Sequence, residues 1–435
     1  MSFYDARLET LDRDALRAHQ EERLRRLMAV VPRSAFYRRK LAAAGIDPAS
    51  ISSLDDLARL PFTTKAELLA AQRREPPFGG LTTRPPADYR YLYRTSGTSG
   101  RPLLWLDGEE DWATWLRAWG AVYRGAGVGA EDVVFGAFSF GPFISHWTAM
   151  AGAAHVGALC VPGGGMSSRQ RLEAILDHRC TVLVSTPTYA LHLAAVAAAE
   201  GLDLASSAVR VTIHAGEPGA SVASVRRRLA AAWGARPFDH AGATEVGAWA
   251  FSCREQTLEP HLNELEFVCE VVDGASGEAV ADGERGELVI TTLGRPGMPV
   301  LRYRTGDLVI RSRRPCPCGR HLARIRGGVL GRADDMQVVR GVNVYPSLVD
   351  DLVRALPEVV EYRVEVDRRQ ALDELRIHLE LAPGASFAAA ERRLAAAFRS
   401  RLGLRVVILE AAAGSLPRFE LKARRWVRLE AEPGS

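Results

Sequence analysis

The stretch Tyr93-Arg94-Thr95-Ser96-Gly97-Thr98-Ser99-Gly100-Arg101-Pro102 combines hydroxyls, glycines and cations, and a hydrophobic run follows at 103–106. Glycine lets backbone N–H groups converge on one point because it has no Cβ. Converging N–H groups, hydroxyls and a cation are how proteins bind phosphate oxygens. The spacing is not that of a Walker A loop, GxxxxGK[ST]. The stretch therefore predicts either a phosphate-binding loop or a polar turn between two strands.

The composition restricts the class of protein. A chain of 435 residues exceeds one compact core, so two or more domains are expected. Its 47% hydrophobic and 25% charged residues are typical of a soluble globular protein, and a net charge of +4 gives no argument for nucleic-acid or membrane partners. Neither a signal peptide nor a run of ~18 apolar residues is visible, so we expect a cytoplasmic protein. Six cysteines then favour free thiols or metal ligands over disulfides.

Outward from the loop, strand and helix signals alternate. Two helices are expected within residues 8–44, and Thr64 with Glu67 predicts a capping box at the start of another. Strand–helix alternation after the loop predicts a mostly parallel sheet with covering helices. The expected helices are 111–122, 144–157, 172–176, 189–200 and 222–233, and the expected strands are 133–138, 182–185 and 209–213.

Beyond residue 260 the pattern changes. Short strands at 266–272, 286–292 and 308–311 predict a small antiparallel β unit. A polar break at 331–335 precedes a final hundred residues with their own α+β pattern. The predicted fold is therefore α/β, with a large N-terminal domain, residues 1–332, of mostly parallel sheets plus a small β unit, and a small α+β C-terminal domain, residues 333–435.

Five further motifs follow the opening loop in order. They are AGATE at 241–245, YRTGDL at 303–308, GRADD at 331–335, RGVNVYP at 340–346 and PRFELK at 417–422. The ordered set resembles the adenylate-forming acyl-CoA ligase superfamily. It is most similar to the phenylacetate–CoA ligase family, because of residues 62–65, 186–191 and 341–346. The resemblance covers nearly the whole chain and implies an ATP-binding N-terminal domain followed by a mobile C-terminal lid.

The resemblance implies a role in ATP binding for residues of several motifs. The opening loop would close over the β- and γ-phosphates, with Arg101 in the place of the usual lysine. Glu245 would hold Mg²⁺, which prefers oxygen ligands, and Asp307 would accept hydrogen bonds from the ribose hydroxyls. The alternatives are a solvated carboxylate for Glu245 and a turn aspartate for Asp307. The implied nucleotide-binding set is Thr95, Ser96, Gly97, Ser99, Gly100, Arg101, Ala215, Gly216, Glu217, His240, Ala241, Gly242, Thr244, Asp307 and Arg332.

Catalysis is implied for Lys422, Glu245 and Thr98. A cation at the α-phosphate stabilises the charge that develops during adenylation, an effect worth ~3–4 kcal/mol. The alternative for Lys422 is a surface lysine on a basic tail. Asp334 matches the hinge about which the C-terminal domain would rotate between the two half-reactions, withdrawing Lys422 and bringing residues 340–345 to the site.

Two positions depart from the family pattern. Ala241 stands where an aromatic residue commonly stacks on adenine, so part of that platform is lost or His240 replaces it. Leu421 stands where a glycine usually precedes the catalytic lysine.

The cysteines form a separate constellation. Cys253, His261, Cys316 and Cys318 match a Cys₃His pattern that the resemblance associates with structural zinc. Thiolates and imidazole favour tetrahedral Zn²⁺, and four protein ligands leave no open position for catalysis. Unliganded thiols are the alternative.

An acyl pocket is expected from aromatic side chains suited to an aryl or arylacetic acid, although ordinary core packing would account for most of them. The five candidates are Phe138, Phe140, Phe143, Trp147 and Tyr189.

Together these features predict a ligase that needs ATP and Mg²⁺, adenylates an aromatic acid and transfers the acyl group to CoA. One alternative acceptor is a carrier-protein pantetheine thiol, an amine or another small nucleophile. A second alternative, favoured by Ala241 and Leu421, is a catalytically silent nucleotide-binding protein. The expected partners are the small-molecule substrates and, as an assembly, a homodimer. Neither nucleic acid nor a membrane is expected as a partner.

Overall fold

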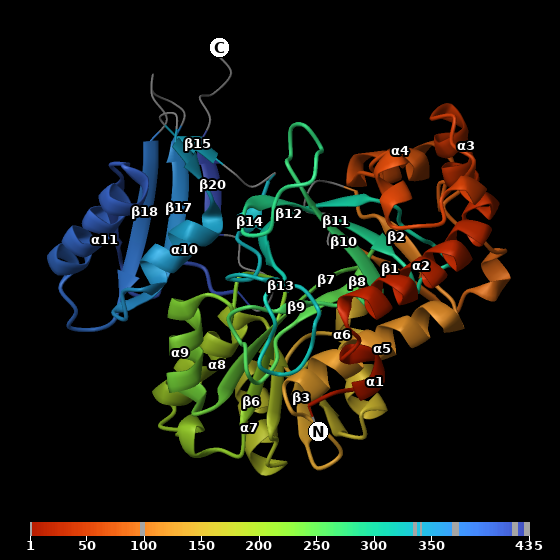
Figure 1. Ribbon diagram of the computed structural model, residues 1–435. Helices are drawn as coiled ribbons and strands as arrows, with labels where there is room; N and C mark the ends of the chain where they lie inside the picture. Colours follow the sequence, from red (N-terminus) through yellow and green to blue (C-terminus); the bar gives the residue numbers. More distant parts are fainter. Residues whose placement is uncertain are drawn as a thin grey trace.

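A computed structural model describes residues 2–95, 101–333, 337–339, 342–367, 374–419 and 425–429. A large N-terminal domain carries a long twisted sheet, and a small C-terminal domain, drawn in blue in Figure 1, lies beside it. The predicted fold class is confirmed. Within the described residues, no helix is both long and apolar enough to span a membrane.

Parallel strands form one half of the large sheet, in the order β4-β3-β5-β6-β7. All four residues of β5 are buried, as expected for a strand covered on both faces. The edge strand β4 was not predicted, since its ends are exposed and its sequence lacks a strong period. The strands are β3 (Val133–Gly136), β4 (Leu159–Pro162), β5 (Val182–Ser185), β6 (Val211–His214) and β7 (Arg236–Ala243).

Helices connect and cover these strands, as the alternation predicted (Figure 1). One core cluster lies on the α5 and α6 face, and another packs α7, α8 and α9 against the sheet. The helices are α5 (Glu109–Gly125), α6 (Ile144–His155), α7 (Ser168–Asp177), α8 (Pro187–Ala199) and α9 (Ala223–Trp233).

The predicted antiparallel unit continues the same sheet, because β7 pairs with β8 and the order runs on through β9, β13, β12, β11 and β10. Strand β12 starts at Tyr303, so Asp307 lies in a strand and not in a turn. The strands are β8 (Gly247–Phe251), β9 (His261–Leu262), β10 (Phe267–Val272), β11 (Arg285–Thr292), β12 (Tyr303–Ser312), β13 (Arg324–Ile325) and β14 (Gly331–Arg332).

The N-terminal helices pack on the antiparallel half of the sheet. The predicted capping box begins α4, where Thr64 N donates to Glu67 Oε2 at 2.7 Å and Glu67 N donates to Thr64 Oγ1 at 3.2 Å. Strands β1 and β2, which flank the opening stretch in the sequence, pair as an antiparallel hairpin. The elements are α1 (Ala6–Glu9), α2 (Arg13–Val30), α3 (Ala35–Ala43), α4 (Lys65–Arg74), β1 (Tyr91–Arg94) and β2 (Leu104–Asp107).

The C-terminal domain has its own apolar core, formed between a four-stranded sheet and two helices. Strand β20, which was not predicted, pairs in parallel with β17. The elements are the hairpin β15 (Gln337–Val339) and β16 (Val342–Val344), then α10 (Pro346–Arg354), β17 (Val359–Asp367), β18 (Glu374–Leu381), α11 (Phe387–Leu402), β19 (Val407–Ala411) and β20 (Trp426–Leu429).

Candidate active site

The carboxyl ends of β3, β5, β6 and β7 lie at one edge of the sheet, because these strands are parallel neighbours. Ligands of open α/β sheets bind outside this edge. The loops that follow the four strands carry many of the residues that the sequence suggested, from Phe138 to Glu245.

Glu245 is buried, and its Oε1 accepts a hydrogen bond of 2.6 Å from the Tyr303 hydroxyl. Burial and the neighbouring carboxylate raise the pKa of Tyr303 well above its usual value, so this hydroxyl keeps its proton and donates. No described residue bonds to the other oxygen of Glu245. An oriented carboxylate with a free oxygen suits a hard cation such as Mg²⁺.

Arg295 holds the backbone beside Glu245 by a hydrogen bond. Its Nη1 donates to the carbonyl of Thr244 at 2.9 Å, and its Nε and Nη2 donate to Asp107 Oδ1 at 3.0 and 2.6 Å. Both side chains of this ion pair are 1% exposed. Sequence reasoning missed Arg295 and the role of Tyr303; an arginine inside the turn Gly294-Arg295-Pro296-Gly297 was the only signal.

Asp307 and Arg332 are brought together as the motifs suggested, because they face each other in the pairing of β12 with β14. Arg332 Nη1 lies 3.3 Å from Asp307 Oδ1 and donates to the carbonyl of Thr305 at 3.1 Å. The pair fixes the orientation of a carboxylate that is only partly buried. A ribose hydroxyl could reach such a carboxylate.

The loop after β6 holds Ala215, Gly216 and Glu217. Gly216 has φ +93°, a conformation that side chains rarely adopt, and so lets the backbone turn at the strand end. Glu217 Oε1 accepts a hydrogen bond of 2.8 Å from the backbone N of Thr188, which joins this loop to the start of α8.

His240 does not lie on the Ala241 side of β7, because successive strand residues point to opposite faces. Its ring lies against Trp119 of α5 at 4.4 Å, and its Nδ1 donates to the carbonyl of Ala250 at 3.3 Å. Burial lowers the pKa of His240 to about 4. The ring is therefore a neutral part of the core beneath the site, whereas Gly242, two residues further along β7, is exposed.

Thr95 closes the neck of the opening loop. Its N donates to the carbonyl of Leu103, and its Oγ1 accepts from the N of Leu103, both at 3.0 Å. The hydroxyl is therefore used within the hairpin. Arg101 is exposed at the other end of the loop. The remaining predicted residues Ser96, Gly97, Thr98, Ser99, Gly100, Asp334 and Lys422 lie outside the described residues.

Four of the five acyl-pocket candidates gather around His146 at the start of α6. Phe138 stacks on His146 at 4.5 Å, Phe143 meets the same ring at 6.1 Å, and Phe140 lies 5.0 Å from Trp147. Burial lowers the pKa of His146, and its Nδ1 donates to the Ser139 carbonyl at 2.9 Å.

The fifth candidate, Tyr189, lies in the first turn of α8 and is fully buried in the core that packs α7, α8 and α9 against the sheet. Its hydroxyl bonds to Ser168 Oγ at 3.0 Å, and the guanidinium of Arg171 covers its ring. The described contacts of its ring and hydroxyl are with α7 and with His192 of its own helix, and none is with the rings around His146.

The four predicted metal ligands also meet. Their donor atoms lie within 4.8 Å of one another, with Cys253 Sγ 3.7 Å from Cys316 Sγ and Cys318 Sγ 3.5 Å from His261 Nε2. Ligands bound tetrahedrally at the usual Zn–S length of ~2.3 Å would lie about 3.8 Å apart. Hydrogen bonds from the neighbouring thiols lower the pKa of Cys318, which favours a thiolate. The donor set and its spacing fit zinc.

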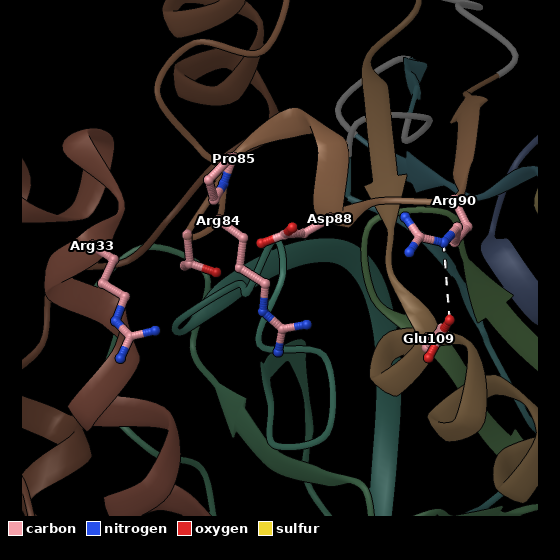
Figure 2. Close-up of a pocket in the computed structure, with 7 residues that line it drawn as sticks. Arg33, Arg84, Pro85, Asp88, Arg90 and Glu109 are labelled. Atoms are coloured by element: carbon pink, nitrogen blue, oxygen red, sulfur yellow. Dashed lines mark ion pairs between the residues drawn. The ribbon is translucent and has the colours of Figure 1, made fainter.

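A surface cavity of about 440 Å³ lies elsewhere, and Figure 2 shows the arginines and acids around it. Its charges are largely matched, since Arg84 pairs with Glu110 and Arg90 lies 3.9 Å from Glu109. None of the predicted site residues lines it.

Known proteins resemble this chain in both sequence and structure. The family described as "AMP-binding enzyme" matches residues 17–294, and "AMP-binding enzyme C-terminal domain" matches residues 341–428. The phenylacetate-coenzyme A ligase of Thermus thermophilus is 37% identical over 87% of this chain and 84% of its own length. That of Escherichia coli is 32% identical over 96% of each.

Solved structures of a 2-hydroxyisobutyryl-CoA ligase are similar to this chain in two different states of that ligase. In its postadenylation state this protein matches with a TM-score of 0.93 at 30% identity, over 98% of this chain and 92% of the other. In its thioesterification state the TM-score is 0.75, over 99% and 93%. The family, its fold and its relatives agree, and the chain belongs to the AMP-binding enzyme family as an adenylate-forming acid–CoA ligase.

Proposed function

We propose that this ligase acts on an aromatic carboxylic acid. The observation that carries the proposal is the group of aromatic rings around His146, at the sheet edge where the nucleotide residues also lie. The end of β1 contacts the segment that carries these rings, because Arg94 N donates to the Pro142 carbonyl at 2.9 Å. The phenylacetate-coenzyme A ligases among its relatives act, as their name states, on an arylacetic acid.

In the first half-reaction an acid oxygen attacks the α-phosphorus of ATP, and the bond to the β-phosphate breaks to release pyrophosphate. Glu245, held by Tyr303, would ligate Mg²⁺, which neutralises phosphate charge. Asp307 and Arg332 would bind the ribose. The loop at 95–101 would contact the phosphates, with Thr98 near the α-phosphate that is transferred to the acid. Lys422 would stabilise charge at the α-phosphate. In the second half-reaction the CoA sulfur attacks the acyl carbon and AMP leaves.

Adenine would lie beside Ala215, Gly216 and Glu217. Ala241 has no ring and the His240 ring lies against Trp119, so neither position would supply a ring that stacks on the base. We therefore propose weaker adenine packing than an aromatic residue at position 241 would give.

Pyrophosphate release with a panel of acids tests the function. We expect release with phenylacetate or benzoate derivatives and a CoA thioester as the product by mass. Lys422→Ala should lower adenylation about 10²–10³-fold, as loss of a charge-stabilising group does. Acyl transfer to a carrier-protein thiol but not to CoA would contradict the assignment of CoA as the acceptor. A wild-type rate in Lys422→Ala would contradict the role of the lysine.

A small aliphatic hydroxy acid is the second candidate substrate, because the 2-hydroxyisobutyryl-CoA ligase matches nearly the whole chain. The same panel decides between the two. Preference for 2-hydroxyisobutyrate over every aromatic acid would overturn the aromatic assignment and leave the ligase activity in place.

We also infer that the structure has the domain arrangement of the adenylation side of the reaction. The support is the higher TM-score with the postadenylation state than with the thioesterification state of one relative, at similar coverage.

A structural zinc ion is a further part of the proposal. Cys253, His261, Cys316 and Cys318 would bind it and join β8, β9 and the turn after β12. We expect close to one zinc per purified chain, and a lower melting temperature after chelation. Protein that is free of metal, with a melting temperature unchanged by added zinc, would contradict this assignment.

A further inference from the structure

The two domains meet where α10 lies beside α9, as Figure 1 shows, and hydrogen bonds also join β17 to α9 and Arg425 to α8. Among the described residues, three pairs make hydrogen bonds across this boundary. Ser224 Oγ donates to Asp351 Oδ1 at 2.8 Å, Arg228 Nη2 donates to the Val359 carbonyl at 3.1 Å, and both Nη atoms of Arg425 lie 3.4 Å from Thr188 Oγ1.

Arg425 is fixed firmly on its own side of the boundary. Its Nε and Nη2 donate to the two oxygens of Glu361 at 2.7 and 3.1 Å, and its guanidinium lies over the Tyr362 ring. The side chain is 8% exposed. Arg425 therefore moves with the C-terminal domain and presents its remaining N–H groups to Thr188. It follows Lys422 by three positions in the sequence.

Thr188 connects this contact to the nucleotide loop. Its hydroxyl faces Arg425, and its backbone N donates to Glu217 Oε1 at 2.8 Å. Ser224 provides a second point on the neighbouring helix and is almost fully buried. The C-terminal domain is thus oriented by contacts on two helices of the N-terminal domain, and one of those contacts leads directly to Glu217.

We propose that Thr188 and Ser224 are positioning residues for adenylation, which hold the C-terminal domain in the present arrangement through Arg425 and Asp351. The inference rests on the proposed assignment of this arrangement to the adenylation side. The contacts join parts of the two domains whose relative placement the reaction would have to change, so they should favour the first half-reaction and not the second. Single hydrogen bonds of this kind contribute little enough to be broken in each cycle.

The test measures the half-reactions separately, with an acid that the wild-type enzyme turns over. Pyrophosphate release reports adenylation, and thioester formation from supplied acyl-adenylate and CoA reports the second step. Ser224→Ala, Asp351→Ala and Thr188→Val should each slow adenylation about threefold to tenfold, since each removes one hydrogen bond. Thioester formation should be unchanged or faster.

Matched variants separate positioning from folding. Asp351→Asn and Thr188→Ser keep an oxygen at the contact and should restore adenylation. The Ser224→Ala/Asp351→Ala double variant should be no slower than either single variant, because one contact is lost in all three.

Equal slowing of both half-reactions, or additive losses in the double variant, would overturn the proposal. A wild-type enzyme that forms no acyl-adenylate would instead refute the proposed function, so the two failures are distinguishable.

Discussion

Arg320 and Arg228 both have guanidinium atoms removed from water, but their partners differ. Arg320, in the N-terminal domain, is 0% exposed, and its Nε donates to Glu9 Oε2 at 2.7 Å. Arg228, at the domain boundary, donates to a backbone carbonyl, and its buried Nη1 has no partner among the described residues. Burial lowers the pKa of Arg228 to about 10. One arginine is held by a full counter-charge and the other is not.

The same contrast extends through both regions. Within the N-terminal domain, ion pairs join distant segments: the buried pair of Arg295 with Asp107, and the pair of Arg302 with the partly buried Glu270. Between the described residues of the two domains there are hydrogen bonds and one cation–ring contact, Arg285 over Tyr345, but no ion pair. Breaking a buried ion pair costs several kcal/mol, whereas a hydrogen bond contributes about 1 kcal/mol. The N-terminal domain is thus one permanent unit, whereas the described contacts between the domains are of a kind that is easier to break.

The largest expected effect comes from breaking a permanent contact. Glu9→Ala leaves Arg320 buried without its counter-charge and should lower the free energy of unfolding of the N-terminal domain by about 3–5 kcal/mol. Denaturant melts monitored by tryptophan fluorescence measure it. Glu22→Ala is the matched control, because the Glu22–Arg26 pair is exposed and should cost at most ~1 kcal/mol. If both variants lose the same stability, the Glu9–Arg320 pair does not hold the N-terminal segment in place.

Local patterns in the sequence predicted much of this permanent unit. The Thr64–Glu67 capping box and strand β5 follow from neighbouring residues alone, and both were confirmed. The four Cys and His ligands were predicted from the family pattern, and the structure brings them together. The capping box and β5 need no knowledge of distant partners, whereas the Cys253–Cys316 contact spans 63 positions and was expected only through the family resemblance.

Contacts between distant segments could not be predicted in this way. Tyr303 bonds to Glu245 across 58 positions, and Arg295 pairs with Asp107 across 188, so neither partner is visible from sequence spacing. The exposed strand β4 and the short strand β20 were missed because their pairing with a neighbour, and not their own periodicity, makes them strands. The sequence likewise suggested His240 as an adenine platform because it could not show which face of β7 each side chain occupies.

A buried histidine makes the stability of the N-terminal domain depend on pH, and this effect is of intermediate size. His214 bonds to the Ser185 carbonyl and Thr212 Oγ1, and burial lowers its pKa to about 4. Its unfolded pKa is near 6.5, so the unfolded chain binds a proton that the fold excludes, and stability falls as pH drops from about 6.5 to 4. The slope is about 1.4 kcal/mol per pH unit in this window.

The difference between wild type and His214→Gln isolates this contribution. Asp239 has a pKa raised to about 6 by burial and opposes the histidine, but it is present in both proteins. The stability gap between wild type and variant should therefore narrow as pH falls from 6.5 to 4. A gap that stays constant with pH would show that His214 takes up a proton in the folded state.

The smallest expected effect comes from the contact between the two domains. There the substitution should strengthen the contact and not weaken it. Arg228→Met removes a poorly compensated charge and keeps an apolar stem, so the domains should separate less readily despite the lost hydrogen bond to Val359. The net stabilisation of the present arrangement is small, so thioester formation from supplied acyl-adenylate should slow about twofold to threefold. Pyrophosphate release, which uses the present arrangement, should stay at the wild-type rate. Arg227→Met is the control on the same helix, because Arg227 is exposed. A faster second step in Arg228→Met would mean that this arginine, although it lacks a carboxylate partner, holds the domains together as Arg320 holds the N-terminal segment.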